Sequence, residues 1–307
     1  MGDQILSKTL NEKFDTVFEE VVHSETLNLI NKNELKLFCL DVENNEFSYN
    51  PLVGFLVDNL GRYVFSRAEI DELKMTGKEQ TVVFRASKRL ARAGKPDEKG
   101  TGNELGEILD YCFFEHVLGA PKILSKYEQV TAGGTYKAQS SGVHLLTLGD
   151  EKMSTYQLVY GASGIVDDIQ DAIDKAFEEI ASVSSGQRKE RQVVDSTVMG
   201  KSFDEDTTLR LKDVLLPSKN KAQVDNAYGL FIGYTLGLDA DQYDNDEFRE
   251  AIQEKMRLDI QHHVQYIVEK INSLKLGKCS FYVYVLPLND ALKDKKEIMD
   301  RLLDGDE

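Results

Sequence analysis

Helix-like and strand-like segments follow one another in the C-terminal two thirds of the chain. Residues 103–120 carry apolar side chains at helical spacing, and the same spacing recurs over 165–180. Ser163 is expected to cap the second of these helices, with Asp167 and Asp168 in its first turn. Short apolar runs between the two helices predict three strands, at 121–130, 143–150 and 155–161.

The last third of the chain continues this alternation. Residues 226–238 are apolar and rich in aromatic residues and glycine, which is typical of a buried strand, and 278–288 predicts an aromatic strand. Between them, 244–274 predicts one long amphipathic helix, and a charged helix closes the chain. The order of elements predicts an α/β fold, with a mixed sheet flanked by helices.

The N-terminal part mixes both patterns. "FDTVFEEVV" is typical of a helix and "LKLFCLDV" of a buried strand. The following residues predict a helix that stops at Gly61 and a second one that opens at Ser66.

A boundary is expected after the basic helix predicted at about 82–93. The segment that follows, "AGKPDEKGTGNE", is the clearest break in the chain because of its glycine, proline and charge content. We therefore expect a smaller N-terminal α+β region over residues 1–98 and a second domain over 99–307.

Composition narrows the class of protein. Of the 307 residues, 41% are hydrophobic and 29% are charged, which is typical of a globular domain. No run approaches the roughly 18 apolar residues of a membrane span, so no membrane contact is expected. Cys39, Cys112 and Cys279 are far apart and form no CxxC pair, which favours buried thiols in a reducing cytoplasm.

The charge is acidic overall but locally basic. A net charge of -16 argues against affinity for nucleic acid over the whole surface. The predicted basic helix, however, carries four cations on one face: Arg85, Lys88, Arg89 and Arg92. This face is either solvated or a local contact for phosphates.

The order of helix and strands also suits a metal-dependent nuclease. Such enzymes use carboxylates from the first helix and from the strands to bind one or two divalent cations. Glu104 and Glu107 lie three residues apart on the predicted helix 103–120 and could supply the helical acid. Both are equally typical of a hydrated first turn that the helix dipole favours.

Five stretches in this part of the chain resemble the HamA family. They are "GNELGEILDYCFFEHVLGAPKILSK", "SSGVHLL", "LVYGASGIVDDIQDAIDKAF", "AYGLFIGYTLGL" and "SFYVYVLPL", and they span roughly residues 102–288. HamA is the effector of the Hachiman anti-phage defence system. The resemblance implies a PD-(D/E)xK nuclease-like core and a superfamily 2 helicase partner, HamB. In this system the helicase restrains the nuclease until phage DNA or DNA damage is sensed, and DNA is then degraded with loss of the infected cell.

The resemblance also implies where the chemistry would lie. Nucleases of this kind carry an aspartate before the second strand, where this chain has Ser141, followed by His144. They carry an acid, one residue and a lysine on the third strand, where this chain has Ala162 and Gly164 at the outer two places.

Alanine and glycine bring no ligand atoms, so other side chains would have to replace them. Glu107 and Asp168 are the expected ligands of Mg²⁺ or Mn²⁺, with Glu104 and His144 beside them. Lys126 on the first strand is expected to contact DNA, and Lys175 is a further candidate.

Three functions remain open from the sequence. The first is a metal-dependent DNA nuclease of HamA type, restrained by a helicase. The second is a regulatory subunit with a degenerate nuclease fold, which binds and gates the helicase without cutting DNA. The third is a cytoplasmic α/β protein unrelated to DNA.

Overall fold

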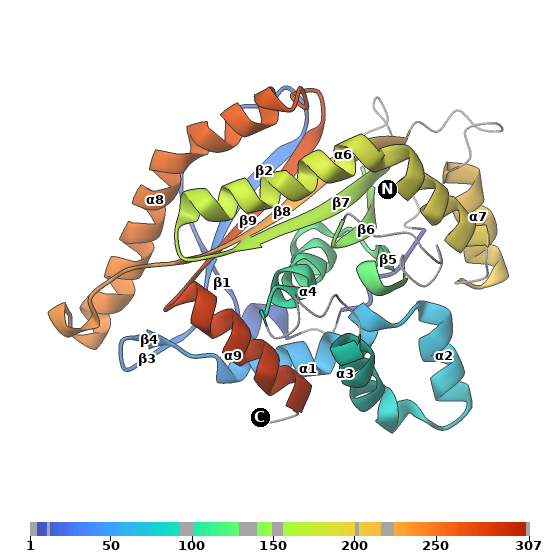
Figure 1. The fold of residues 1–307 in the computed structure, drawn as a ribbon, viewed down its shortest axis with the longest axis horizontal. Helices are drawn as coiled ribbons and strands as arrows, with labels where there is room; N and C mark the ends of the chain where they lie inside the picture. The colour runs from blue at the N-terminus through green and yellow to red at the C-terminus, as the bar shows by residue number, and fades with distance from the viewer. Residues whose placement is uncertain are drawn as a thin grey trace.

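A seven-stranded mixed sheet forms the centre of the protein (Figure 1). The computed structural model describes residues 5–10, 13–92, 101–128, 140–148, 156–199, 203–215 and 224–304. The strand order is β1-β2-β9-β8-β7-β6-β5. The strands are β1 Glu19–Val21, β2 Asn33–Cys39, β5 Lys122–Ser125, β6 Gly142–Thr147, β7 Tyr156–Ile165, β8 Val224–Thr235 and β9 Ser280–Leu288.

Four parallel strands, β2, β9, β8 and β7, make the middle of the sheet, and antiparallel strands flank them on both sides. Every residue of β9 and nearly every residue of β7 is buried. Such continuous burial is expected of parallel strands that helices cover on both faces.

Helices cover both faces of the sheet (Figure 1). The helices that carry the argument below are α1 Asn50–Val64, α2 Arg67–Met75, α3 Val82–Arg92, α4 Glu104–Phe113, α6 Ile169–Met199, α7 Glu205–Leu215, α8 Asn245–Ser273 and α9 Ala291–Asp304. Helices α4 and α9 pack on one face of β7 and β8, and α1 packs against both of them, whereas α6 packs on the other face and contacts α8. Shorter elements are η1 Phe14–Thr16, η2 Glu79–Thr81, η3 Phe114–Leu118, η4 Ala240–Gln242 and the hairpin β3 Val42–Glu43 with β4 Glu46–Phe47.

The α/β order is confirmed, including the helix, three strands and helix between α4 and α6. The predicted start of α2 is also confirmed, because Ser66 and Glu69 form a reciprocal capping box. Helix α1, however, runs through Gly61 to Val64 instead of stopping at the glycine.

Two further local expectations were wrong. The segment at 14–22 is not one helix, because its end forms β1 and pairs with β2. Ser163 lies within β7, so it does not cap α6; the carboxylate of Asp168 accepts hydrogen bonds from the first backbone N–H groups of that helix instead. The division at residue 98 stays a prediction, although the sheet crosses it, since β2 of the first part lies beside β9 of the second.

None of the helices in the described residues is long and apolar enough to span a membrane.

Candidate functional site

The edge of β7 opens where β6 leaves it. The two strands pair as far as Val143 opposite Tyr160, and Ser141 N–H still donates to the Gly161 carbonyl at 3.0 Å. Among the described residues, the last four residues of β7 (162–165) pair with β8 on one side and with no strand on the other. The backbone N–H of Ser163, at this edge of β7, donates to the carboxylate of Glu179 at 3.1 Å. Side chains from β7, α4 and α6 therefore meet at this edge of the strand.

An acidic row on α4 faces this opening. Glu104, Glu107 and Asp110 follow one another at a spacing of three residues, which keeps them near one side of the helix. The helix lies close to the strand, since a Cβ atom placed on Gly106 would come within 2.5 Å of the Ser163 hydroxyl oxygen.

Asp110 is the most enclosed of these acids. It is 1% exposed, and the hydroxyl of Ser141 donates to its Oδ2 atom at 2.6 Å. Its other oxygen, Oδ1, is buried without a hydrogen-bond partner. Burial raises the pKa of the Asp110 carboxyl well above its usual range. An unpaired buried oxygen of this kind is costly unless a ligand, a proton or a cation satisfies it.

Glu107 is held by two donors. The hydroxyl of Tyr63 donates to it at 3.3 Å, and Lys126, which directly follows β5, forms an ion pair with it. Burial raises the pKa of the Glu107 carboxyl even though Lys126 acts in the opposite direction.

Glu179 of α6 completes the carboxyl cluster, which we define as Glu107, Asp110 and Glu179. Burial, and then the charge of Glu107, raise the pKa of Glu179 to about 7. Glu179 and Glu107 also raise the pKa of Asp110. Glu107 thus disfavours ionisation of both Glu179 and Asp110, and a cation bound beside them would act in the opposite direction.

Two lysines meet at the N-terminus of α4. The side-chain oxygen of Asn103 accepts from Lys175 at 3.3 Å and from Lys295 at 2.9 Å, and Lys295 also donates to the Ile165 carbonyl at 2.9 Å. Asn103 makes no side-chain cap on α4. Burial, and then Lys175, lower the pKa of Lys295 to about 8.

The structure brings three of the expected site residues together: Glu107, Ser141 and Lys126. Glu104 is half-buried and near enough for its charge to raise the pKa of Glu107. Asp110 and Glu179 were missed by the sequence reasoning.

His144 lies in the core. It is 1% exposed, its Nδ1 atom is 2.8 Å from the Ala120 carbonyl oxygen, and its ring meets Phe114 edge to face. Burial lowers the pKa of His144 to about 4, so the ring is neutral at physiological pH. These contacts are those of a packing residue.

Ala162 and Gly164 do not face the carboxyl cluster. A Cβ atom on Gly164 would lie 2.0 Å from the carbonyl oxygen of Ala172 in α6, so this position has no room for a lysine or for any side chain. A Cβ atom on Gly161 would instead meet the Ser141 hydroxyl and Asp110. Because side chains alternate along a strand, the residues at the end of β7 that face α4 are Gly161, Ser163 and Ile165.

Asp168 is exposed at the start of α6. Its carboxylate accepts from the backbone N–H of Gln170 at 2.8 Å and of Asp171 at 3.1 Å. The neighbouring Asp167 accepts from the Thr235 hydroxyl at 2.8 Å and from a backbone N–H of α9. Both carboxylates are therefore engaged in ordering the ends of strands and helices.

The four cations of α3 are not equivalent. Arg89 pairs with Glu69 at 2.8 Å and lies over the Phe65 ring, so it stabilises the contact between α2 and α3. Lys88 lies over the exposed ring of Phe84, with 4.2 Å between Nζ and the ring centroid. Arg85 and Arg92 are exposed, so a partner could reach most of this face.

The residues present suit a cation with few protein ligands. No group of three or more His, Cys, Asp and Glu side chains that could hold a metal occurs among the described residues. Mg²⁺ commonly uses only one or two carboxylates and completes its shell with water and substrate phosphates. The unpaired oxygen of Asp110, with Glu107 beside it, fits that requirement.

Two comparisons with known proteins complete the description of the site. A protein-family model described as HamA matches residues 15–302. No curated protein matches the chain.

Proposed function

This chain belongs to the HamA family of the Hachiman anti-phage defence system, and we propose that it is the effector of that system, a metal-dependent DNA nuclease. In this proposal its core is of the PD-(D/E)xK type. A superfamily 2 helicase of the HamB kind restrains it in the cytoplasm until phage DNA or damaged DNA is sensed.

The observation that carries the proposal is the carboxyl cluster at the open edge of β7. Glu107, Asp110 and Glu179 come from both helices that cover this strand, and Lys126 is paired with one of them. Carboxylates that can bind a divalent cation, with a lysine beside them, are parts that phosphodiester cleavage uses.

In the active form, Asp110 and Glu107 would hold Mg²⁺ or Mn²⁺. The cation would lower the pKa of a bound water and offset negative charge on the phosphate. Lys126 would be released from Glu107 and would orient the phosphate as a point charge. Ser141 would fix the orientation of Asp110 through its 2.6 Å hydrogen bond.

DNA would approach across the basic residues. Lys126 lies at the site itself, and Arg85, Lys88 and Arg92 on α3 are exposed. In an acidic protein, such a local basic face would confine contact with phosphates to one side.

A second function is favoured by a specific observation on β7. The residues at the end of β7 that face α4 are Gly161, Ser163 and Ile165, which supply neither an acid nor a lysine. The chain would then be a regulatory subunit that binds the helicase partner and gates it without cutting DNA.

Plasmid nicking separates the two functions. We expect cleavage with Mg²⁺ or Mn²⁺ by the isolated chain or by its complex with the helicase. Asp110→Asn and Glu107→Gln should lower the rate by about a hundredfold or more, equal to about 2.7 kcal/mol in the barrier. Glu178→Gln, on the exposed side of α6, is the matched control and should cut normally. Phage protection without cleavage by either form would favour the regulatory subunit.

A further inference from the structure

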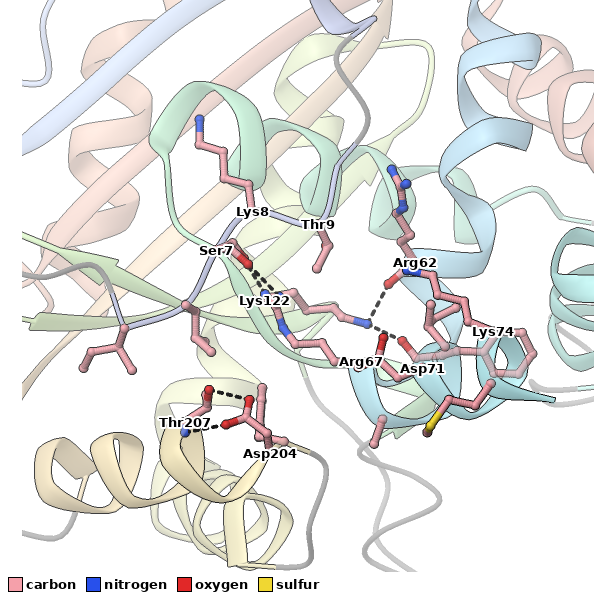
Figure 2. A pocket seen from close by; sticks show the side chains of 17 residues that line it. Ser7, Lys8, Thr9, Arg62, Arg67, Asp71, Lys74, Lys122, Asp204 and Thr207 are labelled. Atoms are coloured by element: carbon pink, nitrogen blue, oxygen red, sulfur yellow. Dashed lines mark hydrogen bonds between the residues drawn. The ribbon is translucent and has the colours of Figure 1, made fainter. Parts of the chain in front are cut away.

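A pocket lies on the side of α1 and α2, lined by different residues from the carboxyl cluster (Figure 2). It has a volume of about 630 Å³ and is bounded by the N-terminal segment 5–9, the end of α1, α2, Lys122 of β5 and the start of α7. The volume is within the range of about 300–1,000 Å³ that is typical of small-molecule sites.

The lining of this pocket is basic although the protein is acidic. Five cations line it, namely Lys8, Arg62, Arg67, Lys74 and Lys122. Among the described residues, only Asp71 and Asp204 contribute carboxylates to the lining, and Asp204 accepts from the backbone N–H and the hydroxyl of Thr207 at the start of α7. The lining thus carries more cations than carboxylates although the protein has a net charge of -16, and two carboxylates behind it, Glu115 and Glu128, also act on Arg67.

Two of the cations are engaged elsewhere. Lys122 is buried and donates to Glu128 at 2.8 Å and to three backbone carbonyls at the end of α1. Lys8 donates to the His116 carbonyl at 3.1 Å. The charge available to a ligand therefore comes from Arg62, Arg67 and Lys74.

Arg67 has a donor with no acceptor. Its Nη atoms bond to Ser7, at 2.6 Å to the carbonyl oxygen and 3.4 Å to the hydroxyl, and Figure 2 shows these bonds across the pocket. Its Nε atom is buried without a hydrogen-bond partner. Burial lowers the pKa of this guanidinium, because the charged group loses hydration that the neighbouring acids do not fully replace. An anion that accepts from Nε would supply the missing partner.

Apart from the hydroxyl residues Ser7, Thr9 and Thr207, the rest of the lining is apolar. Phe65 and Ile70 contribute from the α1–α2 side, Phe203 from the side of α7, and Met75 at the end of α2 is 82% exposed. A flat ring could lie on these side chains while a negative group reaches Arg67. Phosphate is the negative group that a guanidinium and a lysine recognise best together.

We propose that this pocket binds a nucleoside phosphate, with the phosphate on Arg67 and Lys74 and the base against the apolar side. Two sources share that chemistry: a free nucleotide and the phosphorylated 5′ end of a DNA strand. The pocket is lined by other residues than the carboxyl cluster, so its occupation is measurable whether or not the chain cuts DNA.

Calorimetric titration of the full chain tests the proposal. The probes are adenosine 5′-monophosphate, adenosine, inorganic phosphate and a short oligonucleotide with either a 5′-phosphate or a 5′-hydroxyl. We expect the nucleotide to bind at least about tenfold more tightly than adenosine or phosphate alone. If the end of a strand is the source, the 5′-phosphorylated oligonucleotide binds more tightly than both the nucleotide and its 5′-hydroxyl form.

Three variants make the test specific to the pocket. Lys74→Glu, at an exposed position, should weaken nucleotide binding by about tenfold or more without unfolding the protein. Arg67→Gln should do the same, and its fold is checked by its melting temperature. Lys78→Glu changes charge equally but lies outside the pocket and should bind normally. The proposal is overturned if neither phosphorylated probe binds up to about 1 mM, or if Lys78→Glu weakens binding as much as Lys74→Glu.

Discussion

Replacing Glu179 by glutamine should stabilise the protein near pH 8 and change its stability little near pH 4.5. Glutamine has the shape of the protonated carboxyl and keeps an oxygen that accepts from the Ser163 N–H, a bond of 3.1 Å. The substitution therefore removes the ionisation of Glu179 while preserving its contact with β7.

The magnitude follows from the pKa of Glu179, which burial and the charge of Glu107 raise from an ordinary 4.5 to about 7. Above its ordinary pKa the unfolded chain loses this proton, whereas the folded protein keeps it until the pH passes about 7. The folded state is therefore progressively disfavoured between these two values, and the loss is constant at higher pH. At about 1.4 kcal/mol per pH unit, the loss amounts to about 3 kcal/mol as an upper limit.

Urea unfolding between about pH 4.5 and pH 8, in the presence of a chelator, measures this effect. The free energy of unfolding of Glu179→Gln minus that of the wild type should grow by up to about 3 kcal/mol across the range. Glu178→Gln, one residue away and exposed, should show no such growth. If the two variants behave alike, or if Glu179→Gln has the same effect at both ends of the range, Glu179 does not belong to a coupled carboxyl cluster.

Three further outcomes are expected. Gly164→Ala should lower the free energy of unfolding by about 3 kcal/mol, because its Cβ would lie 2.0 Å from the Ala172 carbonyl oxygen. Gly54→Ala, inside α1 with nothing within 4 Å of its Cβ, should instead raise the free energy of unfolding by about 0.5–1 kcal/mol. Ser141→Ala should cost about 1–3 kcal/mol, because it leaves Asp110 buried without its donor, and an unchanged denaturation midpoint would contradict the 2.6 Å bond. Near pH 7.5, millimolar Mg²⁺ should raise the melting temperature of the wild type but not that of Asp110→Asn, and an equal rise in both would exclude Asp110 as a ligand.

The order of elements was predictable because each segment carries its own signal. The capping box of Ser66 and Glu69 and the long pattern behind α8 are local features, and local features survive into the fold. Residues 14–22 were misread because a short amphipathic segment suits a helix or an edge strand equally well. Pairing with β2, the next strand along the chain, decides between them, and this pairing is not visible within the segment itself.

The register of β7 could not be read from its sequence. Nearly all of its residues are buried, so no alternation of polar and apolar positions marks which residues face α4. A shift of one residue exchanges Ala162 and Gly164 for Gly161 and Ser163. The packing of Gly164 against the α6 backbone is what fixes the choice.

Asp110 could have been found from the sequence. It lies three residues after Glu107 and six after Glu104, so the acidic spacing on α4 continues into the apolar part of the helix. Glu179 carried a weaker signal, since it is one of several acids on α6, and only the approach of that helix to the edge of β7 distinguishes it.

Lys122 of β5 ties this strand to the end of α1 through three hydrogen bonds. Its ammonium group donates to the carbonyls of Arg62, Tyr63 and Phe65, and both donors to Glu107 are attached to these two elements: Tyr63 on α1 and Lys126 directly after β5. A protein that displaces α1 would carry both donors away from Glu107 together, leaving a buried carboxyl with a still higher pKa. The charge state of the carboxyl cluster could thus be set from the outer surface of α1, by a partner that never touches the cluster.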